Sequence, residues 1–435
     1  MKVLGVALAL FAFLAGAPGR AAEAEKQPVT IIHAGHLLAI PGAPMRANVS
    51  LVIRAGRITA LVDGFVNRPP GDAQDVPVRI VDLAQRYVLP GLIDGHVHLT
   101  LAIGQSPPLV KASEAARTII AVAHARQALW VGFTTVRDVG AAGLEVFALR
   151  DAIAAGLVPG PRILAAGEIV STTGGHGDVS GYRRDVLQVL QPMAICDSPY
   201  ACRKVVRLLV KYGADLIKLS ATGGGAERHG GPDDPPEMFN DELRAVVETA
   251  HSFGLKVAAH AHGTAGIKAA LRAGVDSIEH GTFLDDEAIA LFLRTGAWLV
   301  PTLSVRDRLA ENFFKTSGAI RAREERMLRE TVPTMKRAYK AGVKFALGSD
   351  AGVVPHGQGA RELEWLVKVG LSPAEALVVA TLNTADMMGL GGDIGSLEVG
   401  KSADVIAVAD NPLADISALR KITFVMRAGV IYRRK

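Results

Sequence analysis

Apolar positions form short runs at both ends of the chain. Near the N-terminus, the runs 29–32, 49–53 and 58–62 are separated by tight turns, which is typical of β-strands. The runs 403–408, 422–426 and 428–432 near the C-terminus have the same pattern. Because chain termini often lie close together, we expect both ends to pair into one small β-sandwich.

Between these ends, apolar runs of strand length alternate with amphipathic helical patterns. The clearest helical patterns are 115–129, 241–253, 264–273 and 285–294, and most of the helices end at a glycine. Eight strands alternating with helices predict an α/β fold, a TIM-like (β/α)8 barrel with its functional groups at the C-terminal strand ends. The eight predicted strands are 87–93, 134–139, 162–167, 216–220, 256–260, 277–280, 298–303 and 344–348.

The first residues are typical of a signal peptide. Lys2 precedes an apolar run, and Ala22-Glu23-Ala24 predicts cleavage after Ala24. An uncleaved membrane anchor is the alternative. Export predicts a periplasmic or secreted protein with no membrane association after cleavage. The predicted organisation is a signal peptide, the first part of the sandwich, the barrel and the second part of the sandwich, at residues 1–24, 25–85, 86–390 and 391–435.

Composition favours a globular enzyme. Hydrophobic residues make up 49% of the 435 residues, and 46 are glycine. The net charge is +5, but the conspicuous charged segment 321–326 mixes both signs, so nothing indicates a nucleic-acid partner. The two cysteines, Cys196 and Cys202, would close a small disulfide loop in an oxidising compartment; two free buried thiols are the alternative.

Metal-binding residue types recur where the predicted strands end. His96 and His98 follow the first strand, and alternation along a strand points both side chains to one face. Lys218 lies within the fourth strand, where an ammonium among apolar residues would be costly. The remaining candidates are His260 and His262 at the fifth strand, His280 at the sixth and Asp350 at the eighth. In a barrel all of them converge on one rim.

Each residue type has a chemical role at such a rim. Imidazoles bind zinc as neutral donors, carboxylates bind it as anions, and a lysine joins only without its charge. Carbamylation of Lys218 by carbon dioxide would give a carboxylate-like bridge between two metal ions. Such a centre activates water and polarises a carbonyl. Asp350 would then act as general base and afterwards as general acid.

These motifs resemble the amidohydrolase superfamily, in particular its binuclear members with a carboxylated lysine. The segments 94–98, 217–218, 259–263, 278–281, 348–352, 371–377 with Thr381, and 395–404 match in order. The resemblance implies two zinc ions and catalytic roles for Asp350 and His280. It also implies His260 as the fifth-strand ligand, with His262 as the alternative. The implied metal ligands are His96, His98, Lys218, His260, His280 and Asp350.

Within the superfamily, the chain looks most similar to exported imidazolonepropionase-like and prolidase-like dipeptidases that cleave before Pro, Arg or Lys. It also resembles amidohydrolases that cleave ochratoxin A into phenylalanine and ochratoxin alpha. True imidazolonepropionases and the deaminases lack the lysine on strand four. The resemblance implies hydrolysis of an amide whose amine half is an amino acid, by a homo-oligomer such as an octamer. A cyclic amide or lactone hydrolase and a non-catalytic binding protein are the alternatives.

Candidate substrate-binding residues lie in the loops after the strands. His176, in a glycine-rich loop after strand three, is placed to hydrogen-bond a substrate carbonyl or carboxylate; capping a turn is the alternative. An arginine there would bind a free carboxylate through two hydrogen bonds. His356 is placed either at the rim or on a solvent-facing loop. The other candidates are Tyr182, Arg228, His229 and His262.

Overall fold

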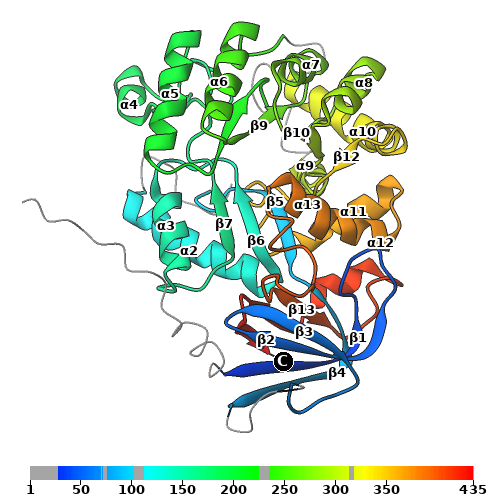
Figure 1. The fold of residues 1–435 in the computed structure, drawn as a ribbon. Helices are drawn as coiled ribbons and strands as arrows, with labels where there is room; N and C mark the ends of the chain where they lie inside the picture. The colour runs from blue at the N-terminus through cyan, green and yellow to red at the C-terminus, as the bar shows by residue number, and fades with distance from the viewer. Residues whose placement is uncertain are drawn as a thin grey trace, which may run out of the picture.

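The computed structural model describes residues 28–69, 71, 76–101, 112–224, 235–312 and 318–434. The predicted signal peptide with Ala24, and the candidates Arg228 and His229, lie outside these residues. Figure 1 shows two regions, a β-sheet region that contains both ends of the described chain and a larger region of strands surrounded by helices.

The strands of both chain ends form one seven-stranded sheet in the order β15-β14-β13-β4-β1-β2-β3. The C-terminal β13 pairs antiparallel with β4, with Ile406 opposite Leu89. The predicted pairing of the two ends is therefore confirmed, in one continuous sheet. The strands are β1 (Val29–Leu37), β2 (Arg46–Arg54), β3 (Arg57–Asp63), β4 (Val78–Pro90), β13 (Val405–Val408), β14 (Phe424–Arg427) and β15 (Val430–Arg434).

One hydrophobic cluster holds this sheet together. Residues that are distant in sequence contribute to it, because the strands of the two ends alternate their side chains toward the same core. The cluster includes Ile32, Leu51, Val88, Val405, Ala407, Phe424 and Met426.

The larger region is an α/β fold built on two parallel sheets, which confirms the predicted class. Their orders are β5-β6-β7 and β12-β11-β10-β9-β8. The strands are β5 (Leu92–Val97), β6 (Phe133–Asp138), β7 (Arg162–Ala165), β8 (Leu216–Ser220), β9 (Lys256–Ala261), β10 (Ser277–His280), β11 (Trp298–Val300) and β12 (Lys344–Phe345).

Helices cover the outside of the two sheets, as Figure 1 shows. The helices of the described part of the chain are α2 (Glu114–Trp130), α3 (Glu145–Ala154), α4 (Arg184–Leu190), α5 (Pro199–Lys211), α6 (Asn240–Ser252), α7 (Thr264–Ala273), α8 (Asp286–Thr295), α9 (Val305–Asn312), α10 (Gly318–Lys340), α11 (Ala360–Val369), α12 (Pro373–Val378), α13 (Thr384–Met387), the π-helical turn η3 (Val379–Asn383) and the 3-10 helix η4 (Ile416–Lys421).

Local signals explain where several helices begin and end. The side chains of Ser113, Ser198 and Asp285 accept hydrogen bonds from backbone N–H groups in the first turns of α2, α5 and α8. Gly274 and Gly296 end α7 and α8 in the left-handed conformation. Within the described part of the chain, every helix is too short or too polar to span a bilayer.

Hydrogen bonds link the two parallel sheets at both junctions. The backbone N–H of Asp350, after β12, donates to the carbonyl of His96 in β5 over 2.8 Å. At the other junction, Ser220 in β8 donates to the carbonyl of Val170, after β7, over 2.9 Å. The strand ends that carry the candidate ligands therefore lie beside one another.

The first predicted strand, 87–93, is wrong as a single element. Its first half belongs to β4, and β5 starts only at Leu92. Gly91 lies between them, where a Cβ atom would come within 2.1 Å of Thr134 Oγ1, so the chain passes from one sheet to the other at a close contact. The sequence conceals this change because both strands are apolar there.

Candidate metal centre

The structure brings the six predicted metal ligands together. His96 lies in β5 with His98 one residue beyond it, Lys218 and His260 lie in β8 and β9, His280 ends β10, and Asp350 follows β12. His262 joins them from the end of β9. Each of these seven side chains belongs to a residue that is at most 9% exposed.

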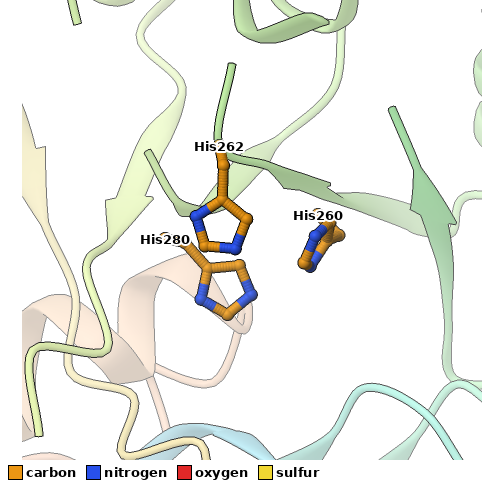
Figure 2. Close-up of side chains that lie close together, drawn as sticks. All are labelled: His260, His262 and His280. Atoms are coloured by element: carbon orange, nitrogen blue, oxygen red, sulfur yellow. The ribbon is translucent and has the colours of Figure 1, made fainter. Parts of the chain in front are cut away.

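Three histidines form the first group that could hold a metal ion (Figure 2). The rings of His262 and His280 are stacked with centroids 4.6 Å apart. The His260 ring stands edge-on to both, with centroids 4.8 and 4.7 Å away. Each residue offers one ligand atom, and these atoms lie within 4.8 Å of one another.

A second group of ligand atoms shares a residue with the first. His96, His280 and Asp350 also offer atoms within 4.8 Å of one another, so His280 belongs to both groups. Oδ1 of Asp350 lies 3.3 Å from Nε2 of His98 and 3.5 Å from Nε2 of His96. The two groups of candidate ligands therefore adjoin, and together they offer more donor atoms than the three of either group alone.

The second ring nitrogen of four histidines already has a partner. Nδ1 of His98 donates to the carbonyl of Gly140 over 2.8 Å, and Nδ1 of His96 lies 2.7 Å from the Glu279 carboxylate. Nδ1 of His262 and Nδ1 of His280 each lie 2.7 Å from a threonine hydroxyl, that of Thr282 and Thr302 respectively. These bonds fix the rings and leave Nε2 for a metal, as around bound zinc.

Two buried atoms in the cluster fit a cation. Nε2 of His260 and Oδ1 of Asp350 have no hydrogen-bond partner among the residues that the structure describes. Buried polar atoms are normally satisfied, so unpaired ones call for an explanation. A lone-pair nitrogen and a carboxylate oxygen are both zinc ligands. The donor set is therefore suited to a metal ion.

The protein keeps several of these histidines neutral. Burial lowers the pKa of His96 to about 4, and burial together with the neighbouring histidines lowers the pKa of His260 and His280 well below its ordinary value. Burial alone would lower the pKa of His98. Contact with Asp350 has the larger effect, so the pKa of His98 is raised. Neutral imidazole is the form that binds metals.

Lys218 and Asp350 respond to burial in different ways. Burial lowers the pKa of Lys218 to about 8, so in a fraction of the protein molecules Lys218 is an uncharged amine near neutral pH. Burial opposes ionisation of Asp350, yet His96 and His98 outweigh it and lower the pKa of Asp350 to about 2. An unprotonated lysine is the form that can react with carbon dioxide.

Sequence reasoning missed a buried ion pair below the cluster. Glu279 accepts hydrogen bonds from Arg137 over 2.8 Å and from Ser277 over 2.6 Å while it also binds His96. Arg137 further donates to the carbonyl of Gly95 over 2.6 Å. The signal that identified Lys218, a charge within an apolar strand, does not mark Arg137, because β6 also contains two threonines and an aspartate.

The substrate-binding candidates fall into different places. The ring of His176 stacks on that of His260, with centroids 3.9 Å apart, so it lies directly beside the cluster. Tyr182 is 40% exposed, on the loop before α4. His356 is buried, stacks on His124 and bonds the carbonyl of Leu101, so it holds the chain that follows His98.

Two carboxylates that the sequence did not reveal hold the His176 loop. The Glu237 carboxylate accepts hydrogen bonds from the backbone N–H of His176 at 3.1 Å and from the Ser220 hydroxyl at 2.9 Å. The Asp197 carboxylate accepts from the N–H and the hydroxyl of Thr173. Neither residue belongs to a motif, so only the folded chain reveals these contacts.

Comparison with known proteins identifies the family. The sequence pattern that defines the amidohydrolase family matches residues 87–432 of this chain. The chain belongs to the amidohydrolase family. This amidohydrolase is 33% identical to an ochratoxinase of Aspergillus niger, over 95% of this chain and 88% of that protein. Family membership makes it a hydrolase of C–N bonds, so the non-catalytic alternative is set aside.

Solved structures agree with this assignment. A Xaa-Pro dipeptidase with methionine bound in its active site is 37% identical, with a TM-score of 0.84, over 93% of this amidohydrolase and all of that chain (100%). The crystal structure of the A. niger ochratoxinase is 30% identical, with a TM-score of 0.82, over 94% and 96% of the two chains. The likeness therefore covers both the sheet region and the α/β region.

Proposed function

We propose that this amidohydrolase uses two zinc ions to hydrolyse a peptide or amide bond whose amine half is an amino acid with a free carboxylate. The observation that carries the proposal is that two groups of buried candidate ligands adjoin at the strand ends. His96 and His98 would hold one ion and His260 the other. The two sites are completed by His280, Asp350 and the carbamate of Lys218. His262 is the alternative to His260 as a ligand.

The metal ions would supply Lewis acidity and lower the pKa of water. The protein's own residues position the substrate and move the protons. Asp350 is ionised, because the neighbouring histidines lower its pKa to about 2, so it is ready to accept a proton from water. The same carboxyl group then delivers that proton to the leaving amine. His280, between the two groups, takes part in the same centre.

The substrate class rests on the relatives and on His176. One relative is named an ochratoxinase and another a Xaa-Pro dipeptidase. His176 is fixed beside His260 by its ring contact and by its bond to Glu237. We assign it to the substrate carbonyl or carboxylate. Tyr182, Arg228, His229 and His356 stay predictions as substrate contacts.

We also propose the following organisation for the whole protein. The two parallel sheets form a closed (β/α)8 barrel over residues 86–390, and the seven-stranded sheet folds into a β-sandwich from residues 25–85 and 391–435. Residues 1–24 direct export to the periplasm or the medium. The mature protein is a homo-oligomer.

A substrate panel tests the function. The zinc-loaded protein is offered Xaa-Pro, Xaa-Arg and Xaa-Lys dipeptides, N-acyl amino acids and ochratoxin A, and release of the amino acid is measured. We expect turnover of at least one class and two metal ions per chain by elemental analysis. Turnover of cyclic amides or lactones alone would favour the alternative reaction. One metal ion per chain would contradict the binuclear centre.

A further inference from the structure

Glu362 is a buried carboxylate that the proposed reaction does not use. It lies in the first turn of α11 and its exposed fraction is 0%. Its Oε1 accepts a hydrogen bond from the backbone N–H of Leu303, and its Oε2 accepts one from Ser304, both over 2.7 Å. Burial raises the pKa of Glu362 to about 8 although both backbone hydrogen bonds act to lower it, so the fold holds a carboxyl group that is costly to ionise against a single turn of the chain.

That turn begins with a strained residue that contacts a candidate ligand. Thr302 has a φ of 46°, a left-handed conformation that is rare for a β-branched residue. Its Oγ1 lies 2.7 Å from Nδ1 of His280. Such strain persists only where the surroundings hold it, and the two N–H groups bound by Glu362 come directly after Thr302.

The same turn reaches a second candidate ligand. The hydroxyl of Ser304 donates to the carbonyl of Ser349 over 3.0 Å. Asp350 comes next and has a φ of 56°, while His280 has a φ of 72°. One carboxylate on α11 therefore braces a turn that bonds His280 directly and Asp350 through its neighbour.

We propose that Glu362 is a positioning residue that sets the directions of His280 and Asp350 through the 302–304 turn. Displacing this turn would move Thr302 Oγ1 and free the His280 ring to rotate. The expected loss of turnover rests on the function proposed above. The expected loss of metal affinity does not, because metal binding is measured without substrate.

Matched variants of the full chain test this role. Glu362→Gln keeps the shape but presents an amide N–H to a backbone N–H, so one of its two hydrogen bonds is lost. Thr302→Val removes the hydroxyl that binds His280, and Thr302→Ser retains it. The control is Glu242→Gln in α6, where another buried carboxylate accepts a backbone N–H, that of Phe239, over 2.8 Å.

Two readouts separate positioning from stability. Zinc affinity is measured by competition with a coloured chelator, and the geometry of the centre by the visible spectrum of the Co2+-substituted protein. We expect Glu362→Gln and Thr302→Val to lose about tenfold or more in zinc affinity and to change the Co2+ spectrum. Thr302→Ser and Glu242→Gln should bind zinc and Co2+ as the unaltered protein does. Against a cleaved substrate, kcat should fall more than KM rises.

Wild-type zinc affinity and Co2+ spectra in Glu362→Gln would overturn the proposal, even if the variant melts at a lower temperature. If Glu362→Gln does not fold, Glu362→Asp replaces it, because the shorter side chain keeps the carboxyl group but cannot reach both N–H groups equally. If the unaltered protein binds zinc but hydrolyses no amide, the proposed function is refuted. The role of Glu362 is then still decided by comparing the zinc affinities of its variants with that of the unaltered protein.

Discussion

At the scale of single residues, Lys218 decides between a binuclear centre and a simpler one. We expect Lys218→Ala to lose at least one metal ion per chain and most of its turnover, because alanine cannot form the bridging carbamate. A small carboxylate such as propionate, added at high concentration, should restore part of both by entering the vacated space. Elemental analysis and amino-acid release measure the outcome. Full metal content and turnover in Lys218→Ala without propionate would refute the bridge.

The buried histidines make stability depend on pH. Burial holds the pKa of His260 well below 6.5, so the folded chain keeps this ring neutral where the unfolded chain takes up a proton. Its contribution to stability is present above pH 6.5 and is lost as the pH falls. In metal-free protein, His260→Gln should therefore lose less stability on acidification, by up to about 1.4 kcal/mol per pH unit.

Denaturant unfolding at pH 7, 6 and 5 measures this difference. Comparing the variant with the unaltered protein is necessary because Asp94 and Asp138, whose pKa burial raises to about 6, act in the opposite direction in both proteins. The control is His36→Gln, since His36 is exposed in β1. Parallel pH curves for His260→Gln and the unaltered protein would contradict the expectation.

Residues at strand ends could be predicted from the sequence, whereas the residues that support them could not. His96, His98, Lys218 and His280 are recognisable because each breaks or ends an apolar run. Arg137 and Glu279 act as a pair 142 positions apart in the chain, so only the packed strands reveal their partnership. The role of Thr302 depends on a backbone conformation, which a sequence pattern does not encode.

At the scale of elements, strands bounded by polar residues were predicted best. β8 and β10 have the predicted bounds, because charged or glycine-containing segments lie on both sides of each strand. The run 87–93 failed because two strands of different sheets adjoin across Gly91 without a polar residue between them. β11 and β12 are shorter than predicted, since strained residues such as Thr302 redirect the chain.

The disulfide connects one of these elements to the site. Cys196 and Cys202 are bonded, as predicted, and join the start of α5 to the segment that precedes it. The N–H of Cys196 donates to the carbonyl of Ser171 over 2.8 Å, and the neighbouring Asp197 holds Thr173. The disulfide therefore anchors the base of the loop that carries His176.

We expect the double variant Cys196→Ser, Cys202→Ser to lose about 2 kcal/mol of stability, because the closed loop is short. Its kcat should also fall, since the His176 loop loses an anchor. Denaturant unfolding and amino-acid release measure the two effects. A thiol reductant should shift the unaltered protein toward the variant and leave the variant unchanged. Turnover that stays unchanged in the folded double variant would show that this anchor does not serve the site.

At the scale of the whole molecule, the proposed metal centre joins the two parallel sheets. His96 and His98 come from the three-stranded sheet, whereas Lys218, His260 and His280 come from the five-stranded one. Metal ions between them would act as cross-links that the unfolded chain lacks. A ligand present at 100 times its dissociation constant stabilises a fold by about 2.7 kcal/mol.

Chelation should therefore lower the melting temperature and increase hydrogen exchange in β5 and in β8 to β10 together, because both sheets lose the same cross-link. Adding zinc back should restore both properties. His98→Ala lacks one of the two proposed ligands from the three-stranded sheet. Chelation should therefore change its melting temperature and hydrogen exchange less than those of the unaltered protein. The strands β1 and β2 of the seven-stranded sheet provide the internal control, since they carry none of the proposed ligands. Unchanged exchange in β5 after verified metal removal would contradict a metal link between the sheets.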